Sequence, residues 1–231
     1  MLLFDIDGTL VRAGGSGRKA LNEAVFNLYG RRDAVSELSL AGRTDLWNFR
    51  EAVRVAGAVP TPRQVERLHR EYLRLLPAYV RRSWRTGTYH VPPGVRALLR
   101  RLHRVPGVLL GLGTGNMEKG ARIKLEPSGF NDYFPFGGFG SDAMSRPALL
   151  RKAVRRAERM SGAKVRREDV FVIGDTPLDV AAGRKAGYRT VAVGTGFSPW
   201  KDLKASKPDH LSRDFRDTKR WLSWFGLGPR P

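Results

Sequence analysis

The first ten residues join an apolar run of strand length to two carboxylates, Asp5 and Asp7, which are followed by Gly8 and Thr9. Residues two apart in a strand face the same side, so both carboxylates are expected to emerge together where the strand ends. Two carboxylates this close repel each other unless one is protonated or a cation lies between them. An Asp-Gly pair also forms ordinary hairpin turns, which is the alternative interpretation. The run predicts a strand that delivers acids to a turn.

The chain has 231 residues and contains no cysteine. This length suits one large domain, or a domain with a smaller insertion, that buries a sizeable core. The lack of cysteine excludes disulfides, thiolate metal sites and a thiol nucleophile. Asp5 and Asp7 interrupt the first apolar run before it reaches the length of a signal-peptide core, and no later run approaches ~18 residues. We therefore expect a soluble cytoplasmic protein without a membrane partner.

The formal net charge of +20 raises the question of a polyanionic partner. A strongly basic surface attracts nucleic acid or acidic membranes regardless of sequence. However, the 42 basic residues are spread through almost every segment and do not form a tail, and a genome-wide preference for arginine codons produces the same distribution. We therefore expect that nucleic acid is not the partner. The sequence does not indicate an oligomeric state.

Residues 13–88 have the pattern of a small helical module. Three glycines in residues 12–17 predict a flexible joint before it. Apolar residues then recur at helical spacing in three successive segments. Pro77, inside the third segment, is expected to kink that helix or end it early. The predicted helix N-caps are Ser16, Thr44 and Thr61.

After residue 88, short apolar runs alternate with segments of helical periodicity, which is typical of a parallel sheet covered by helices on both faces. The aromatic residues after Asp209 are expected to belong to a terminal helix that docks on the sheet, although aromatic and basic residues together can also stack on bases. The predicted strands cover residues 108–114, 133–139, 169–173 and 190–193. The predicted helices cover residues 95–102, 117–126, 149–160 and 178–185.

Three predicted strands end in acids or in groups suited to phosphate. Ligands of open parallel sheets bind beyond the carboxyl ends of the strands, so these groups are expected to lie together. Single members also have a simple alternative role, because several of them are good helix caps. Four converging carboxylates require a cation, and hard oxygen ligands suit Mg²⁺. The groups are Asp5, Asp7 and Thr9 after the first strand, Thr114, Gly115 and Asn116 after the second, and Asp175, Thr176 and Asp179 after the third.

The segments 5–10 (DIDGTL) and 174–179 (GDTPLD), together with the strand end at Thr114, resemble the motifs of the haloacid dehalogenase superfamily. The similarity is to its phosphoglycolate phosphatase-like branch and extends over nearly the whole chain. Residues 40–45 (LAGRTD) also resemble a cap segment of that branch. The resemblance implies an α/β fold, with a doubly wound parallel sheet in a Rossmann-like core of residues 1–12 and 89–231. It also implies an inserted helical cap of residues 13–88.

The resemblance also implies roles for individual residues. Asp5 would be the nucleophile and a Mg²⁺ ligand, and Asp7 would exchange a proton with the leaving oxygen and water while its carbonyl contacts the metal. Thr114 would hold the transferring phosphoryl group, and Asp175 and Asp179 would complete the metal site. The expected substrate-binding residues are Gly8, Thr9, Gly115, Asn116 and, from the cap, Arg43.

The chain departs from the family pattern at the basic residue that precedes the last acidic motif. The family normally has a lysine there, often followed by proline, whereas this chain has Arg146 and Pro147. Arginine keeps the charge and binds phosphate oxygens in a fork, so we expect Arg146 to take the catalytic role. Lys152 is a weaker candidate for the same role.

The sequence thus predicts a Mg²⁺-dependent phosphatase that hydrolyses a small phosphorylated metabolite through an aspartyl-phosphate. Asp7 argues against dehalogenation, since the dehalogenases of the superfamily lack an acid at that position. Two alternatives remain open: a phosphomutase with the same aspartyl-phosphate chemistry, and a catalytically idle basic binding protein on the same fold. The identity of the substrate cannot be deduced from the spacing of the motifs.

Overall fold

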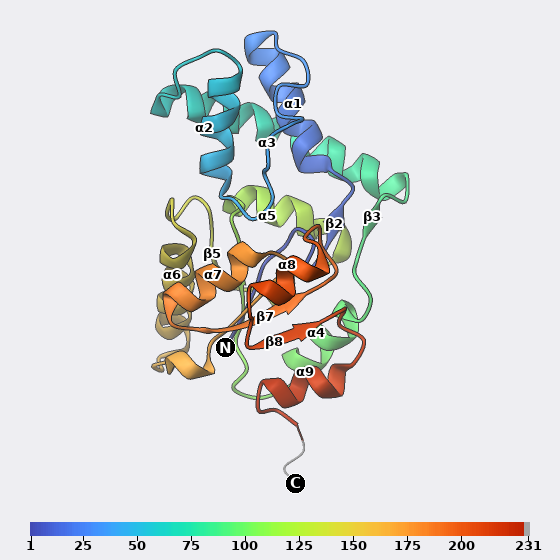
Figure 1. The fold of residues 1–231 in the computed structure, drawn as a ribbon, viewed down its shortest axis with the longest axis vertical. Helices are drawn as coiled ribbons and strands as arrows, with labels where there is room; N and C mark the ends of the chain where they lie inside the picture. Colours follow the sequence, from blue (N-terminus) through green and yellow to red (C-terminus); the bar gives the residue numbers. More distant parts are fainter. Residues whose placement is uncertain (229–231) are drawn as a thin grey trace.

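A computed structural model describes residues 1–228 of the chain, and its centre is a six-stranded parallel sheet in the order β5-β4-β1-β6-β7-β8 (Figure 1). The first strand of the sequence lies inside this sheet, between two strands that follow it much later in the chain. The predicted doubly wound α/β class is confirmed. The strands are β1 (Leu2–Phe4), β4 (Leu110–Gly113), β5 (Phe136–Gly138), β6 (Phe171–Gly174), β7 (Arg189–Val193) and β8 (His210–Ser212).

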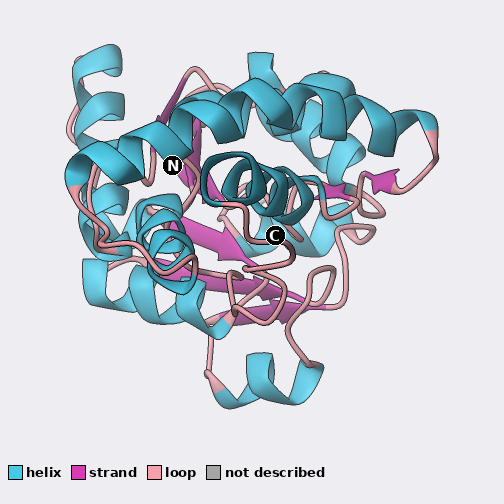
Figure 2. Cartoon of the chain, turned by 90° about the horizontal axis from the view of Figure 1, so that it is seen from above, coloured by secondary structure: helices cyan, strands magenta, loops and turns pink. Residues whose placement is uncertain are grey.

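Helices cover both faces of the sheet (Figure 2). Along β1, Leu2 and Phe4 enter one apolar cluster and Leu3 enters the other, which is why this strand is apolar at every position. The helices around the sheet are α4 (Val95–His103), α5 (Glu118–Leu125), α6 (Arg146–Ser161), α7 (Pro177–Ala186), α8 (Trp200–Ala205) and α9 (Thr218–Trp224). Short 3-10 turns occupy Glu126–Ser128, Asn131–Tyr133 and Arg167–Asp169.

Three further helices, α1 (Ser16–Tyr29), α2 (Asp45–Val55) and α3 (Pro62–Arg85), lie together beyond the carboxyl ends of the strands (Figure 1). The chain enters and leaves this layer through an antiparallel ribbon of β2 (Arg12–Ala13) and β3 (Tyr89–His90). The sequence did not indicate these two-residue strands. The predicted division into a core and a cap of residues 13–88 stays a prediction, and the ribbon lies at its proposed boundary.

Two local predictions in the helical layer need correction, the cap at Ser16 and the early end at Pro77. Ser16 does not cap α1, because Gly15 holds that position and the Ser16 hydroxyl donates to the carbonyl of Ala13. Of the two outcomes expected at Pro77, the early end does not occur, since α3 continues to Arg85 and keeps its apolar side buried throughout. The other outcome, a kink, stays a prediction. The other two caps are confirmed. Thr44 accepts the N–H of Trp47 and Thr61 accepts that of Gln64, both at 3.3 Å.

The C-terminal segment docks on the core as predicted, through a fully buried Trp221 in α9. The strand β8 and the helix α8 in this half of the chain were not predicted. Both are short, and their signals are weaker than those of the longer elements. None of the helices within residues 1–228 combines the length and the apolar character that crossing a bilayer requires.

Candidate active site

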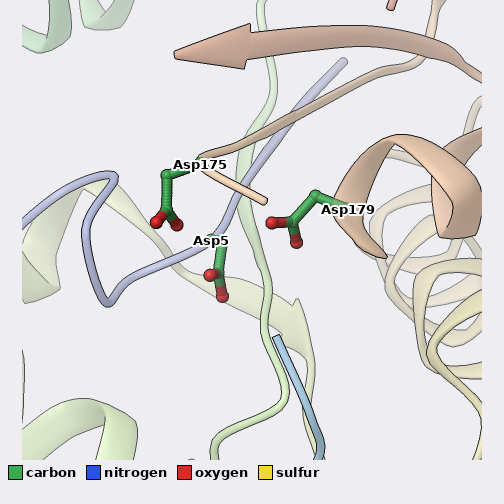
Figure 3. A group of neighbouring side chains, drawn as sticks. All are labelled: Asp5, Asp175 and Asp179. Atoms are coloured by element: carbon green, nitrogen blue, oxygen red, sulfur yellow. The ribbon is translucent and has the colours of Figure 1, made fainter. Parts of the chain in front are cut away.

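Three carboxylates meet at the carboxyl edge of the sheet (Figure 3). Asp5 follows β1, Asp175 follows β6, and Asp179 comes from the first turn of α7. One oxygen of each lies within 4.8 Å of the others, and all three side chains are buried. The parallel pairing of β1 with β6 explains this meeting, because it brings both strand ends to the same edge.

Asp179 is held in place by a reciprocal cap at the start of α7. The Thr176 hydroxyl accepts the N–H of Asp179 at 3.2 Å, and Oδ2 of Asp179 accepts the N–H of Thr176 at 3.0 Å. Pro177 occupies the first helical position, where its missing N–H costs nothing. The capping interpretation and the functional interpretation of this motif are therefore compatible, because the second oxygen of Asp179, Oδ1, takes no part in the cap and accepts a hydrogen bond from Arg146 at the acidic cluster.

Asp175 sits in a narrow enclosure. Its oxygens accept the Thr9 hydroxyl at 3.3 Å and the N–H of Phe197 at 3.1 Å. A Cβ atom on Gly8 would lie 2.5 Å from Asp175 Oδ2, and one on Gly196 only 1.6 Å from it. Gly8 also has a φ of +87°, which favours glycine. Glycine is thus required at both positions for the acid to fit.

The acidic cluster is electrostatically strained in the absence of a cation. Burial, followed by the charge of Asp179, raises the pKa of Asp5 to about 7, although Arg146 acts in the opposite direction. Burial and the neighbouring acids also raise the pKa of Asp175. A divalent cation would relieve this repulsion, and three carboxylates are the hard oxygen donors that Mg²⁺ prefers. The residues present therefore fit a magnesium ion.

Arg146 is the basic residue at this cluster. Its Nη2 donates to Asp179 and lies 3.9 Å from Asp5 Oδ1, while Nη1 donates to the carbonyl of Gly42 at 3.2 Å. The Nε atom is buried and has no partner among the described residues. Lys152 instead donates to the carbonyl of Asp142 at 2.9 Å. The structure therefore favours Arg146 over Lys152 for the basic role.

Thr114, Gly115 and Asn116 follow β4 at the same edge of the sheet. Thr114 is fully buried, and its Oγ1 accepts the backbone N–H of Asn116 at 3.2 Å and the side-chain Nδ2 at 2.9 Å. The backbone N–H of Asn116, which we expected to face a phosphoryl group, thus contacts Thr114 in this structure, as does the side-chain amide. The Asn116 amide also donates to Asp7 Oδ2 at 2.8 Å. The end of β4 is therefore hydrogen-bonded to Asp7, the residue that we expected to exchange a proton with the leaving oxygen.

Lys124 is a site residue that the sequence analysis missed. It lies on the buried side of α5, and its Nζ donates to Asp7 Oδ2 at 2.7 Å and to Asn116 Oδ1 at 2.6 Å. Burial lowers the pKa of Lys124, but the charges of Asp7, Tyr72 and Asp45 outweigh this effect and raise it, so the amine stays charged. The available signal was a lysine within the apolar stripe of a helix, next to buried Ala121 and Leu125.

The helical layer contacts this edge through the segment that resembles a cap motif. The N–H of Asp45 donates to the carbonyl of Gly115 at 2.7 Å, and the N–H of Met117 donates to Asp45 Oδ2 at 2.9 Å. Burial raises the pKa of Asp45 to about 6, against the opposing charge of Lys124. The start of α2 is therefore attached to the core directly beside the candidate site.

Between the helical layer and the sheet lies a cavity of about 470 Å³. Arg43 lines it from an exposed position, with its guanidinium 4.7 Å from the Trp47 ring centroid. Arg18 also lines it but donates to the carbonyls of Ser36 and Leu38. The predicted site residues that line the cavity are Asp5, Asp7, Arg43, Gly115, Asn116, Arg146 and Asp175. Of the others, Thr9, Thr114 and Asp179 each form a hydrogen bond with a lining residue, and Gly8 is next to Asp7 in the chain.

Comparison with known proteins agrees with this geometry. A family model described as haloacid dehalogenase-like hydrolase matches residues 1–187. Pyrophosphatase PpaX from Halalkalibacterium halodurans is 24% identical, with 94% of this chain and 93% of that protein covered. A phosphoglycolate phosphatase from Photorhabdus laumondii is 26% identical, over 98% of this chain and 92% of that protein. The crystal structure of CbbY from Rhodobacter sphaeroides in complex with phosphate is 21% identical, with a TM-score of 0.72 and 94% of each chain covered.

Proposed function

Because this chain belongs to the haloacid dehalogenase-like hydrolase family, we propose that it is a Mg²⁺-dependent phosphatase that hydrolyses a small phosphomonoester through an aspartyl-phosphate on Asp5. The observation that carries the proposal is the position of Asp5. Its carboxylate lies within 4.8 Å of an oxygen of each of the other two acids and 3.9 Å from Arg146 Nη2, and it lines the cavity. A nucleophile at this place adjoins both the proposed cation site and the substrate space.

The residues divide the reaction into two displacements. Asp5 attacks phosphorus, the bond from phosphorus to the leaving oxygen breaks, and Asp7 gives that oxygen a proton. Asp7 then takes a proton from a water molecule, which attacks the aspartyl-phosphate and releases inorganic phosphate and free Asp5. Arg146 stabilises the negative charge on the phosphoryl oxygens throughout.

A magnesium ion would be held by the carboxylates of Asp5, Asp175 and Asp179, with the Asp7 carbonyl as a further ligand. When bound, it would neutralise the acids and polarise the phosphoryl oxygens. Phosphoryl transfer depends chiefly on positioning and charge neutralisation, and these are the properties that the strand ends and Arg146 combine.

The names of the relatives narrow the substrate only to a class. One relative is named a pyrophosphatase and another a phosphoglycolate phosphatase, and both names denote hydrolysis of a small phosphorylated compound. The cavity of about 470 Å³ has room for a ligand of this size. We therefore propose a small phosphorylated metabolite as the substrate.

The test is the release of inorganic phosphate from 4-nitrophenyl phosphate, with Mg²⁺ and with excess chelator. We expect turnover with Mg²⁺ only, and its loss in Asp5→Asn, because a neutral amide cannot act as the nucleophile. Asp132→Asn, at an exposed aspartate, is the matched control and should keep wild-type activity. An active Asp5→Asn protein would contradict the proposal, as would a folded wild-type protein that releases no phosphate from any small phosphomonoester.

A further inference from the structure

Lys124 is a buried lysine that contacts the site from the core and lies beneath the helical layer. Its side chain is only 7% exposed. A Cβ atom on Gly17 of α1 would lie 3.4 Å from Lys124 Nζ and 3.5 Å from the hydroxyl of Tyr72. The Tyr89 hydroxyl donates to the carbonyl of Lys124 at 2.8 Å and so holds the end of α5. The amine is therefore enclosed on several sides and has little freedom to move.

The amine completes a closed triangle of hydrogen bonds with Asp7 and Asn116. Lys124 donates to both of the other residues, at 2.7 Å to Asp7 Oδ2 and at 2.6 Å to Asn116 Oδ1. Asn116 in turn donates to the same Asp7 oxygen at 2.8 Å. These contacts also fix the orientation of the Asn116 amide, because its oxygen must face the ammonium group and its nitrogen the carboxylate.

The two carboxylate oxygens of Asp7 differ in their hydrogen-bond partners. Oδ2 accepts two hydrogen bonds, one of them from a charged donor, whereas Oδ1 accepts none from residues 1–228. The Asp7 side chain is 38% exposed and lines the cavity, so Oδ1 is the oxygen left for a ligand. A carboxylate held through one oxygen has lost most of its rotational freedom.

We propose that Lys124 is a positioning residue of the hydrolysis: with Asn116 it holds Asp7 through Oδ2, so that Oδ1 exchanges the proton with the leaving group. This inference rests on the proposed function. When the bond from phosphorus to oxygen breaks, the leaving oxygen takes the proton from Oδ1 and the electron pair stays on Asp7. The carboxylate that results lies against the Lys124 ammonium group, which stabilises it.

The proposal predicts a dependence on the leaving group that a merely structural lysine would not produce. Phenyl and 4-nitrophenyl phosphate have similar shapes, but phenolate is the more basic leaving group and gains more from protonation. The ratio kcat/KM reports the steps up to the first irreversible one, here the formation of the aspartyl-phosphate. We therefore compare kcat/KM for both esters, with Mg²⁺, in wild-type protein, Lys124→Met and Lys124→Arg. The control is Lys119→Met, which changes an exposed lysine of the same helix.

For Lys124→Met we expect a loss of about a hundredfold with phenyl phosphate and of tenfold or less with 4-nitrophenyl phosphate, the scale of general acid catalysis. Lys124→Arg should recover most of the loss, and Lys119→Met should match wild type. An equal loss with both esters would assign Lys124 to phosphate binding and overturn the proposal, as would no loss with either. If wild-type protein hydrolyses neither ester, the proposed function itself fails, which is a distinct result.

A second comparison keeps the proposal testable if Lys124→Met does not fold, because Asp7→Asn removes the charge that would be left unpaired. In the Asp7→Asn background, adding Lys124→Met should change kcat/KM for phenyl phosphate less than threefold, since the lysine acts through Asp7. A further loss of about a hundredfold in that background would show that Lys124 acts independently of Asp7 and would overturn the proposal.

Discussion

The guanidinium of Arg146 lies 3.9 Å from the carboxylate of Asp5 and also contacts Asp179 and the carbonyl of Gly42. One side chain from the start of α6 thus contacts the proposed nucleophile, an acid of the proposed metal site and the segment that leads into α2. Burial lowers the pKa of Arg146, but the charges of Asp179 and Asp5 raise it, so the group stays charged. Its geometry supports the role that family members normally give to a lysine.

The first prediction concerns this substitution of arginine for lysine. Arg146→Ala should lower kcat by about a hundredfold to a thousandfold, the scale observed when a charge-stabilising donor is removed from a transition state. Arg146→Lys should keep much of the activity, with some loss because an ammonium group cannot reach both Asp179 and Gly42 in the same way. Lys152→Ala is the control and should change kcat less than threefold. Tolerance of Arg146→Ala together with a severe loss in Lys152→Ala would reverse this assignment.

The second prediction concerns the stability of the metal-free protein. Burial raises the pKa of Asp45 to about 6, whereas an aspartate in the unfolded chain titrates near ~3.9. The unfolded chain therefore loses this proton first as the pH rises, and the contribution of Asp45 to the free energy of unfolding falls between about pH 4 and pH 6. We therefore measure the urea midpoints of wild-type protein and Asp45→Asn at pH 4.5 and pH 8. The midpoint of Asp45→Asn, relative to that of wild type, should be higher at pH 8 than at pH 4.5. A difference that is independent of pH would show that the Asp45 carboxyl does not titrate differently in the folded and unfolded chains.

The third prediction concerns magnesium. The pKa of Asp5 is about 7 and that of Asp175 is raised, so protons compete with a cation for these acids at low pH. Mg²⁺ should therefore raise the melting temperature more at pH 8 than at pH 5. The shift should be strongly reduced in Asp175→Asn and preserved in Asp132→Asn. An equal shift at both pH values, or one that survives in Asp175→Asn, would place the ion elsewhere.

The fourth prediction concerns the contact between the helical layer and the core. A Cβ atom on Gly115 would lie 2.1 Å from the backbone carbonyl oxygen of Arg43, so Gly115→Ala must push this segment away. We expect a loss of at least tenfold in kcat/KM for 4-nitrophenyl phosphate, because Arg43 and Gly115, which both line the cavity, would no longer be in contact.

The matched control for this prediction is Gly120→Ala, because a Cβ atom there meets its nearest neighbours at an ordinary 3.7 Å. It lies inside α5, so alanine should stabilise the protein by roughly 0.5 kcal/mol and leave kcat/KM unchanged. The opposite ranking of the two variants would show that the contact at Gly115 does not shape the cavity.

The sequence by itself determined the parts of the protein that depend on local order. The apolar run before Asp5, the run that ends near Thr114 and the run before Asp175 each predicted a strand, and the strands are present. Since parallel strands deliver their carboxyl ends to one edge, the meeting of their acids followed from the pattern. The caps at Thr44 and Thr61 were predictable for the same reason, because a cap involves residues only three positions apart.

Only the tertiary structure decided the contacts between residues that are far apart in the chain. Lys124 lies 117 positions from Asp7, and no periodicity shows that these side chains meet. The ribbon of β2 and β3, the edge strand β8 and the continuation of α3 through Pro77 likewise depend on packing partners that are remote in sequence. Local propensity is a small free-energy term that burial against such partners overrides, so these features required the folded chain.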